Sequence, residues 1–131
     1  MAKQRIHTEQ APRPVGPYSQ AVAVDGWLYV AGQVPIDPAT GNWVKGDIAA
    51  QTERVLQNMQ AILAAAGGGL QDVVKTTIYM ADLGEFTAMN DVYARYFNDA
   101  CPPARATIEA KNLPGGAKLE MEAIARVGAR K

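Results

Sequence analysis

The stretch "PPARATIEAKNLPGGAKLEMEAIA", residues 102–125, contains two β-prone runs separated by a turn. The first run is "RATIEA" (105–110) and the second is "KLEMEAIARV" (118–127). Between them, "KNLPGGA" carries the Pro and Gly residues that suit a turn. The pattern predicts two strands that pair with each other as a β-hairpin inside a small sheet.

Charged residues in these two runs raise the question of function. Arg105 starts the first strand, and Glu120 and Glu122 point to one side of the second because strand side chains alternate. Burying a charge is costly unless the charge is paired or hydrogen-bonded. Two interpretations stay open: Arg105 pairs with one of the two carboxylates, or its planar guanidinium is free to hold a ligand carboxylate through two hydrogen bonds.

The two carboxylates also suggest chemistry of their own. Like-charge repulsion between Glu120 and Glu122 is expected to raise the pKa of at least one of them. A carboxylate of that kind can position or deprotonate a water molecule. The alternative is again a structural ion pair, with Arg105 or Lys118 as the partner.

The segment upstream begins with an extended lead-in and a hairpin. Pro and Gly residues through the first eighteen or so positions disfavour helix and interrupt strand pairing. Asp25-Gly26 then stands between "QAVAV" and "WLYVAGQV", which is the strongest short-range signal for a β-hairpin. "PIDPATGNW" follows as a predicted loop.

Two helices and a strand are predicted in the middle of the chain. Apolar residues recur at steps of three and four from 48 to 66, the period of a helix face, and "DVVKTTIYM" (72–80) is rich in β-branched residues. Asp82 with Glu85 can cap a second helix, whose expected face is Leu83, Phe86, Met89, Tyr93, Tyr96 and Phe97. The order ββαβαββ predicts an α+β fold in which right-handed crossovers place both helices on one face of one mixed sheet.

The other face of that sheet is expected to be uncovered by helices. One side of the last strand carries Leu119, Met121, Ala123, Ala125 and Val127, while Glu120, Glu122 and Ile124 lie on the other. Apolar residues on both sides of a two-layer sandwich leave an exposed patch, which is typical of a partner surface. A symmetric homo-oligomer is the expected assembly.

Composition excludes several classes of function. The chain of 131 residues suits a single domain, 1–131, and its formal net charge of zero argues against nonspecific binding of nucleic acid. One cysteine, Cys101, and one histidine, His7, cannot build a disulfide framework or a His/Cys metal cluster. A polar start and the lack of a long apolar run predict a soluble, cytoplasmic protein.

Several separate motifs, in order, resemble one protein family. They are "APRPVGPYSQAV", "VAGQVPIDPATG", "VVKTTIYMADLGEFTAMNDVYARYF", "PPARATIEAKNLP" and "KLEMEAIA". Together they are similar to the RidA family, also called the YjgF or endoribonuclease L-PSP family, from about residue 6 to residue 127. The resemblance implies a chorismate-mutase-like two-layer fold and a homotrimer with clefts between neighbouring subunits. It also implies a cofactor-independent enamine/imine deaminase that converts 2-imino acids, such as 2-iminobutanoate and 2-iminopropanoate, to 2-oxo acids and ammonia.

The same resemblance assigns expected roles to particular positions. Arg105 of "PPAR" would hold the substrate carboxylate, and Glu120 of "KLEMEAIA" would order the attacking water. The remaining pocket groups would be Tyr18, the backbone of Gly32, Asn90 and the backbone at Thr107. From spacing alone, Tyr18 is equally a packing aromatic and Asn90 a surface residue.

The sequence departs from the best-known bacterial members at two positions. They commonly have cysteine where Thr107 stands and serine where Ala31 stands. Threonine preserves the backbone N–H at position 107, so hydrolysis is still expected, whereas regulation through a thiol there is excluded.

Two other functions are weighed against the deaminase. A binding module could sense 2-oxo or 2-imino acids in the same cleft without turnover. The family's older names suggest an endoribonuclease or translation inhibitor, but RNA binding usually needs a basic, often aromatic-lined surface that a chain of zero net charge does not suggest.

Overall fold

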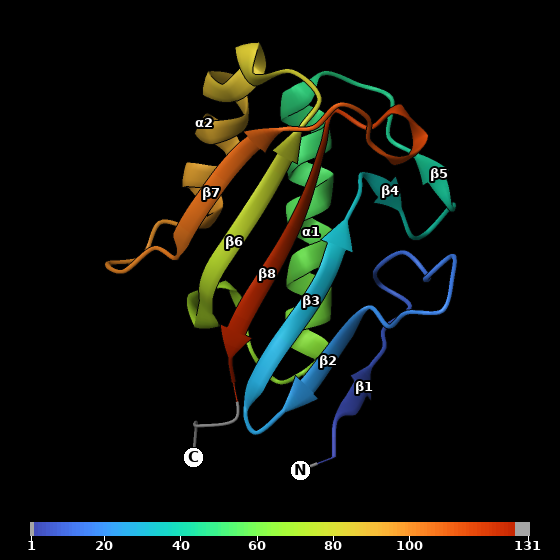
Figure 1. Cartoon of the computed structure of the whole chain (residues 1–131), viewed down its shortest axis with the longest axis vertical. Coiled ribbons are helices and arrows are strands. Elements are labelled where there is room, and N and C mark those ends of the chain that lie inside the picture. Colours follow the sequence, from blue (N-terminus) through green and yellow to red (C-terminus); the bar gives the residue numbers. More distant parts are fainter. Residues whose placement is uncertain (1, 128–131) are drawn as a thin grey trace.

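The computed structural model describes residues 2–127, which form a six-stranded mixed sheet, two α-helices and a small two-stranded sheet. The large sheet has the order β1-β2-β3-β8-β6-β7 and is built from β1 (Gln4–Ile6), β2 (Ala21–Val24), β3 (Trp27–Gln33), β6 (Val73–Met80), β7 (Ala104–Glu109) and β8 (Leu119–Arg126). Figure 1 shows α1 (Ile48–Ala65) and α2 (Phe86–Tyr96) together behind this sheet, so its other face is free of helices. The α+β fold class is confirmed.

The hairpin predicted at Asp25-Gly26 is confirmed. β2 and β3 pair antiparallel, with Val24 opposite Trp27 next to the turn. Asp25 has φ 54° and Gly26 has φ 81°, so both turn residues are left-handed. A two-residue turn of that shape has a twist that matches the twist of the flanking strands.

The first helix follows its predicted face closely. The Asp47 side chain caps the N-terminus by accepting a hydrogen bond from the Ala50 N–H at 2.9 Å. Of the predicted face, Ile48, Thr52, Val55, Leu56, Met59, Ile62 and Leu63 are buried. Gly67, at φ 84°, follows the last turn. The helix packs on α2, β3 and β8, where the core lies.

The second helix starts later than expected. Asp82 caps only a 3₁₀ turn, Leu83–Glu85, by accepting a hydrogen bond from the Gly84 N–H at 2.8 Å. The α-helix itself starts at Phe86. Leu83 therefore lies outside the buried face and is 40% exposed, contrary to the prediction.

The predicted pairing of the last two strands is wrong. β7 pairs in parallel with β6, and β8 lies between β3 and β6, antiparallel to both. The crossover through α2 brings β7 back alongside β6, which requires a parallel arrangement. β8 suits the centre because its inward side is apolar and fully buried, for example at Leu119 and Met121.

Three further short strands come from segments predicted as lead-in and loop. β1 pairs with β2 at the edge of the large sheet. β4 (Ile36–Asp37) and β5 (Asn42–Trp43) form the small sheet beside the end of β3 (Figure 1). No helix within residues 2–127 has the length and apolar character to cross a membrane.

Candidate active site

The six predicted site residues fall into two clusters on opposite faces of the sheet. Glu120 lies opposite Tyr79 in the ladder, on the face without helices. Arg105 lies opposite Thr76, whose hydroxyl contacts Tyr93 of α2, so Arg105 is on the helix face. Arg105 consequently pairs with neither Glu120 nor Glu122, and the ion pair weighed from the sequence is absent among residues 2–127.

The Arg105 guanidinium is held by groups of α2. One guanidinium N–H donates a hydrogen bond to Asn90 Oδ1 at 2.7 Å. The guanidinium carbon lies 4.7 Å from the centre of the Tyr93 ring and 5.4 Å from that of Phe86. Both rings offer their π faces to the cation. These contacts fix the plane of the guanidinium without an anionic partner in the described part of the chain.

Thr107 lies two residues beyond Arg105, on the same face of β7. Its hydroxyl oxygen is buried and has no hydrogen-bond partner within residues 2–127. A buried hydroxyl without a partner costs free energy, so such groups need an explanation. A ligand atom next to the guanidinium is one group that could satisfy it.

Tyr93 of α2 contacts both the Arg105 guanidinium and Thr76 of β6. Its hydroxyl is hydrogen-bonded to Thr76 Oγ1 at 2.8 Å, and burial raises the pKa of Tyr93 above its usual value. The phenol therefore stays neutral, and the ring packs against Phe97 with the two centres 4.5 Å apart.

The second cluster surrounds a cavity of about 430 Å³ at the end of β3. Tyr18, Gly32 and Glu120 all line it. Gly32 permits the carboxylate to lie against the β3 backbone: a Cβ at Gly32 would be 2.8 Å from Glu120 Cδ and closer still to Oε2. Glycine at position 32 is thus needed for the observed place of the Glu120 carboxylate.

Burial raises the pKa of Glu120 above its ordinary value, with a smaller contribution from repulsion by Glu122. The expectation that one carboxylate of this pair has a raised pKa is confirmed, but burial is the larger cause. Glu122 is exposed and accepts a hydrogen bond from the Tyr79 hydroxyl at 3.2 Å. Of the two carboxylates, Glu120 is the one that lines this cavity.

Tyr18 is a partly exposed wall of this cavity. Its hydroxyl accepts a hydrogen bond from the Val15 N–H at 3.3 Å, which leaves the phenolic O–H available as a donor. Tyr18 is 52% exposed in the single chain, so within this chain it does not pack in the core.

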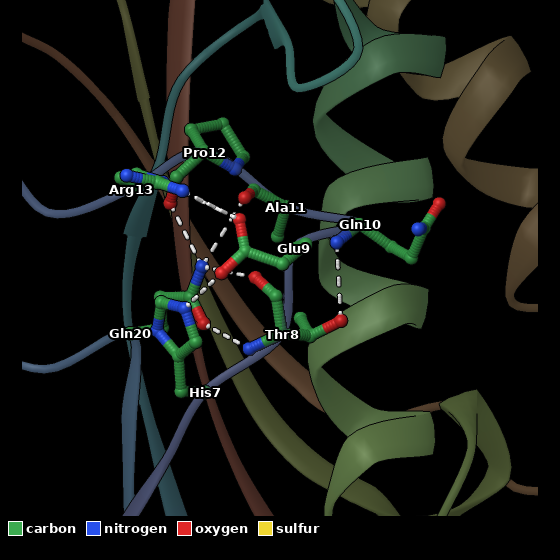
Figure 2. A network of polar contacts seen from close by, with 8 residues as sticks. All are labelled: His7, Thr8, Glu9, Gln10, Ala11, Pro12, Arg13 and Gln20. Atoms are coloured by element: carbon green, nitrogen blue, oxygen red, sulfur yellow. Dashed lines mark hydrogen bonds and ion pairs between the residues drawn. The ribbon is translucent and has the colours of Figure 1, made fainter.

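Gln20 anchors the segment that carries Tyr18, and sequence reasoning missed it. Figure 2 shows its amide inside the loop of residues 8–12. Nε2 donates hydrogen bonds to the carbonyls of Thr8, Ala11 and Pro12 at 3.0, 3.2 and 2.9 Å, and Oε1 accepts one from the Thr8 N–H at 2.8 Å. Only 2% of Gln20 is exposed. One buried side chain thus fixes a loop that has few backbone bonds of its own.

The cavity also has apolar walls that the sequence did not indicate. Trp43 comes from β5, Pro114 from the loop before β8, and Val15 and Ile36 from the lead-in and β4. Ile36, Trp43 and Pro114 meet because the β4–β5 hairpin and the 111–117 segment lie side by side in the fold (Figure 1). No local pattern reveals such a meeting.

The donor set of the described residues offers little for a metal. Within residues 2–127 there is no group of three or more His, Cys, Asp or Glu side chains that could hold an ion. The chemistry available in the two clusters is instead that of a guanidinium, a carboxylate, hydroxyls and backbone amides.

Known proteins resemble this chain over nearly its whole length. The family model described as endoribonuclease L-PSP matches residues 8–127. A RutC family protein of Pyrococcus abyssi is 55% identical over 95% of this chain and 98% of its own. The human protein named 2-iminobutanoate/2-iminopropanoate deaminase is 44% identical over 94% of this chain and 89% of its own. The crystal structure of RidA from the Antarctic bacterium Psychrobacter sp. PAMC 21119 has a TM-score of 0.90 and 41% identity, covering 95% of this chain and 99% of that one.

Proposed function

Because the chain belongs to the endoribonuclease L-PSP family, also called the RidA or YjgF family, we propose that it hydrolyses reactive 2-imino acids to 2-oxo acids and ammonia. The name of the human relative at 44% identity supports this activity. Substrates of the size of 2-iminobutanoate and 2-iminopropanoate are the proposed class. The reaction needs no cofactor, because a protonated imine carbon is already electrophilic.

Arg105 binds the substrate carboxylate in this proposal. Its two-pronged hydrogen bonding matches a carboxylate, and its contacts with Asn90, Tyr93 and Phe86 fix the direction of the fork before substrate arrives. The buried Thr107 hydroxyl lies on the same face of β7 and serves as a further donor in this proposal, together with the backbone N–H at position 107.

Glu120 acts as the general base for the attacking water in this proposal. Water adds to the C=N carbon of the protonated imine while the Glu120 carboxylate accepts one proton from it. That proton then returns to the nitrogen of the resulting carbinolamine. The C–N bond breaks and ammonia leaves while the Glu120 carboxylate accepts the hydroxyl proton, which gives the 2-oxo acid. The Tyr18 hydroxyl and the Gly32 backbone line the same cavity and orient these groups.

The observation that carries the proposed arrangement is the separation of Arg105 and Glu120. They lie on opposite faces of one sheet, so one chain cannot bring them to a single small substrate. We infer a homotrimer in which the Arg105 cluster of one subunit meets the Glu120 cavity of its neighbour. Apolar side chains on the face without helices favour such an assembly, since Trp27, Tyr29 and Ile108 are 39%, 48% and 48% exposed.

A coupled assay tests the function. Threonine dehydratase releases 2-iminobutanoate, which semicarbazide traps in competition with hydrolysis. We expect the purified protein to lower the amount of trapped imine in proportion to its concentration, and Glu120→Gln to lose most of this effect. Binding of 2-oxobutanoate without any change in trapped imine would indicate a sensor instead. RNA cleavage that survives in Arg105→Lys and Glu120→Gln, with no imine hydrolysis in the parent protein, would favour the endoribonuclease.

A further inference from the structure

Trp43 lines two cavities. One is the candidate-site cavity of about 430 Å³, which Glu120 also lines. The other, of about 440 Å³, is lined by Val44, Gly46, Gln51 and Gly115 among others. Within residues 2–127, Trp43 is the one residue that lines both. Trp43 is therefore the residue that the two cavities share.

The β4–β5 hairpin holds Trp43 in place. Trp43 lies opposite Ile36 in the β4–β5 ladder, and the Val44 N–H donates a hydrogen bond to the Pro35 carbonyl at 2.8 Å. Helix α1 supports the base of this hairpin: buried Asn58 donates to the carbonyls of Val34 and Ile36 at 3.1 and 3.0 Å. These bonds make the hairpin a fixed wall.

The indole also lies against the loop before β8. Gly115 has φ 63°, and a Cβ there would be only 2.5 Å from Trp43 Cη2 and 2.6 Å from Cε2. Real side chains do not approach so closely, so the absence of a side chain at position 115 lets the ring pack on the backbone. Trp43 is thus held between its hairpin and this loop.

The candidate cavity has a polar part and an apolar part. Glu120 and Tyr18 supply polar groups, whereas Trp43, Ile36 and Pro114 supply apolar surface. A substrate whose imine carbon lies at Glu120 therefore has apolar walls available for its side chain. Apolar pockets discriminate among side chains by size, because an extra methylene that does not fit costs a factor of about ten or more.

We propose that Trp43 is the specificity-determining residue of this site. It sets the upper size limit for an apolar side chain on the 2-imino acid, because its indole, packed on Gly115, forms part of the apolar wall of the candidate cavity. This inference rests on the proposed function and assigns its substrate class: compact apolar 2-imino acids. Removing the indole enlarges the candidate cavity and admits bulkier side chains.

A substrate series tests the proposal. An L-amino acid oxidase with catalase generates imines from 2-aminobutanoate, leucine and phenylalanine, and kcat/KM is measured for each with the parent protein, Trp43→Ala and Trp43→Leu. We expect the preference for the 2-aminobutanoate-derived imine over the phenylalanine-derived one to fall by about tenfold or more in Trp43→Ala, and by less in Trp43→Leu. Val44→Ala enlarges only the second cavity and is expected to keep the parent preference.

The outcomes separate this inference from the proposed function. If the parent protein hydrolyses none of the imines, the proposed function is overturned and the inference with it. If the parent is active but the preference stays within twofold in both Trp43 variants, the inference alone is overturned. A parallel loss on all substrates, accompanied by a lower Tm, would show that Trp43 is only structural and would likewise overturn it.

Discussion

Replacing Gly32 by alanine is a direct test of the role given to Glu120. The new Cβ would lie 2.8 Å from Glu120 Cδ, whereas ordinary contacts of this kind begin at 3.4 Å. The carboxyl carbon must therefore retreat by at least 0.6 Å, the difference between these distances, and Oε2, which is closer, by more. The displacement of the carboxylate is thus about 1 Å.

A shift of about 1 Å in a catalytic group can cost about a hundredfold in rate. We therefore expect kcat/KM of Gly32→Ala to fall about a hundredfold, which corresponds to roughly 2.7 kcal/mol of transition-state stabilisation. Gly32 does not have a positive φ, so alanine is compatible with its backbone conformation. The fold should remain, and the Tm should change little compared with the loss of activity.

The trapping assay with 2-iminobutanoate measures the effect, and Gly16→Ala serves as the matched control. A Cβ at Gly16 would lie 3.7 Å from the Tyr18 ring, an ordinary contact, so this variant should retain parent activity. Activity of Gly32→Ala within threefold of the parent, at an unchanged Tm, would refute the reasoning that the Glu120 carboxylate must lie against the β3 backbone.

Three other predictions concern the charged groups and the cysteine. Arg105→Lys keeps the positive charge but loses the two-pronged hydrogen bonding of the guanidinium, so kcat/KM and the affinity for a 2-oxo acid should both fall by roughly 10- to 100-fold. Unchanged affinity in calorimetry would contradict this. Because burial raises the pKa of Glu120, its carboxylate disfavours the folded state above the unfolded pKa, so Glu120→Gln should be at least as stable as the parent at pH 7. In chemical denaturation, the difference in the free energy of unfolding between Glu120→Gln and the parent should vanish below about pH 4. Turnover by the parent protein should decline as the pH falls through the raised pKa of Glu120. Alkylation of the exposed Cys101 should leave turnover nearly intact, since position 107 is threonine; thiol-dependent loss of activity would contradict this.

Features set by neighbouring residues were predictable from the sequence. The Asp25-Gly26 hairpin depends on two turn residues that adopt positive φ, and α1 depends on a cap and a 3.6-residue period. Both are local properties, so the printed sequence contains all that is needed. The start of α2 was missed by a few residues because Asp82 caps a 3₁₀ turn first.

The pairing of strands that are distant in the sequence was not predictable in the same way. The 111–117 segment has the composition of a hairpin turn, yet it leads from the edge strand β7 to the central strand β8. Which strand neighbours which depends on the crossover through α2. Alternation correctly grouped Glu120 with Glu122, but the face of Arg105 follows only from its register with Thr76.

The cavity walls depend on the same kind of long-range contact. Gln20 has no local signal for burial, because its partners are carbonyls brought to it by the path of the lead-in. Trp43 and Gly115 are far apart in sequence and meet through the tertiary fold. The motifs therefore indicated the polar groups of the site, whereas its apolar shape required the structure.

The central claim is that each active site combines Arg105 of one subunit with Glu120 of another, and subunit complementation tests it most directly. Arg105→Ala and Glu120→Ala are each expected to be inactive alone. When equal amounts are unfolded and refolded together, three quarters of randomly formed trimers contain both types, and each of these has one intact site of three, so we expect about a quarter of the parent's imine hydrolysis. No recovery of activity in mixed trimers, identified by mass spectrometry, would contradict the shared site.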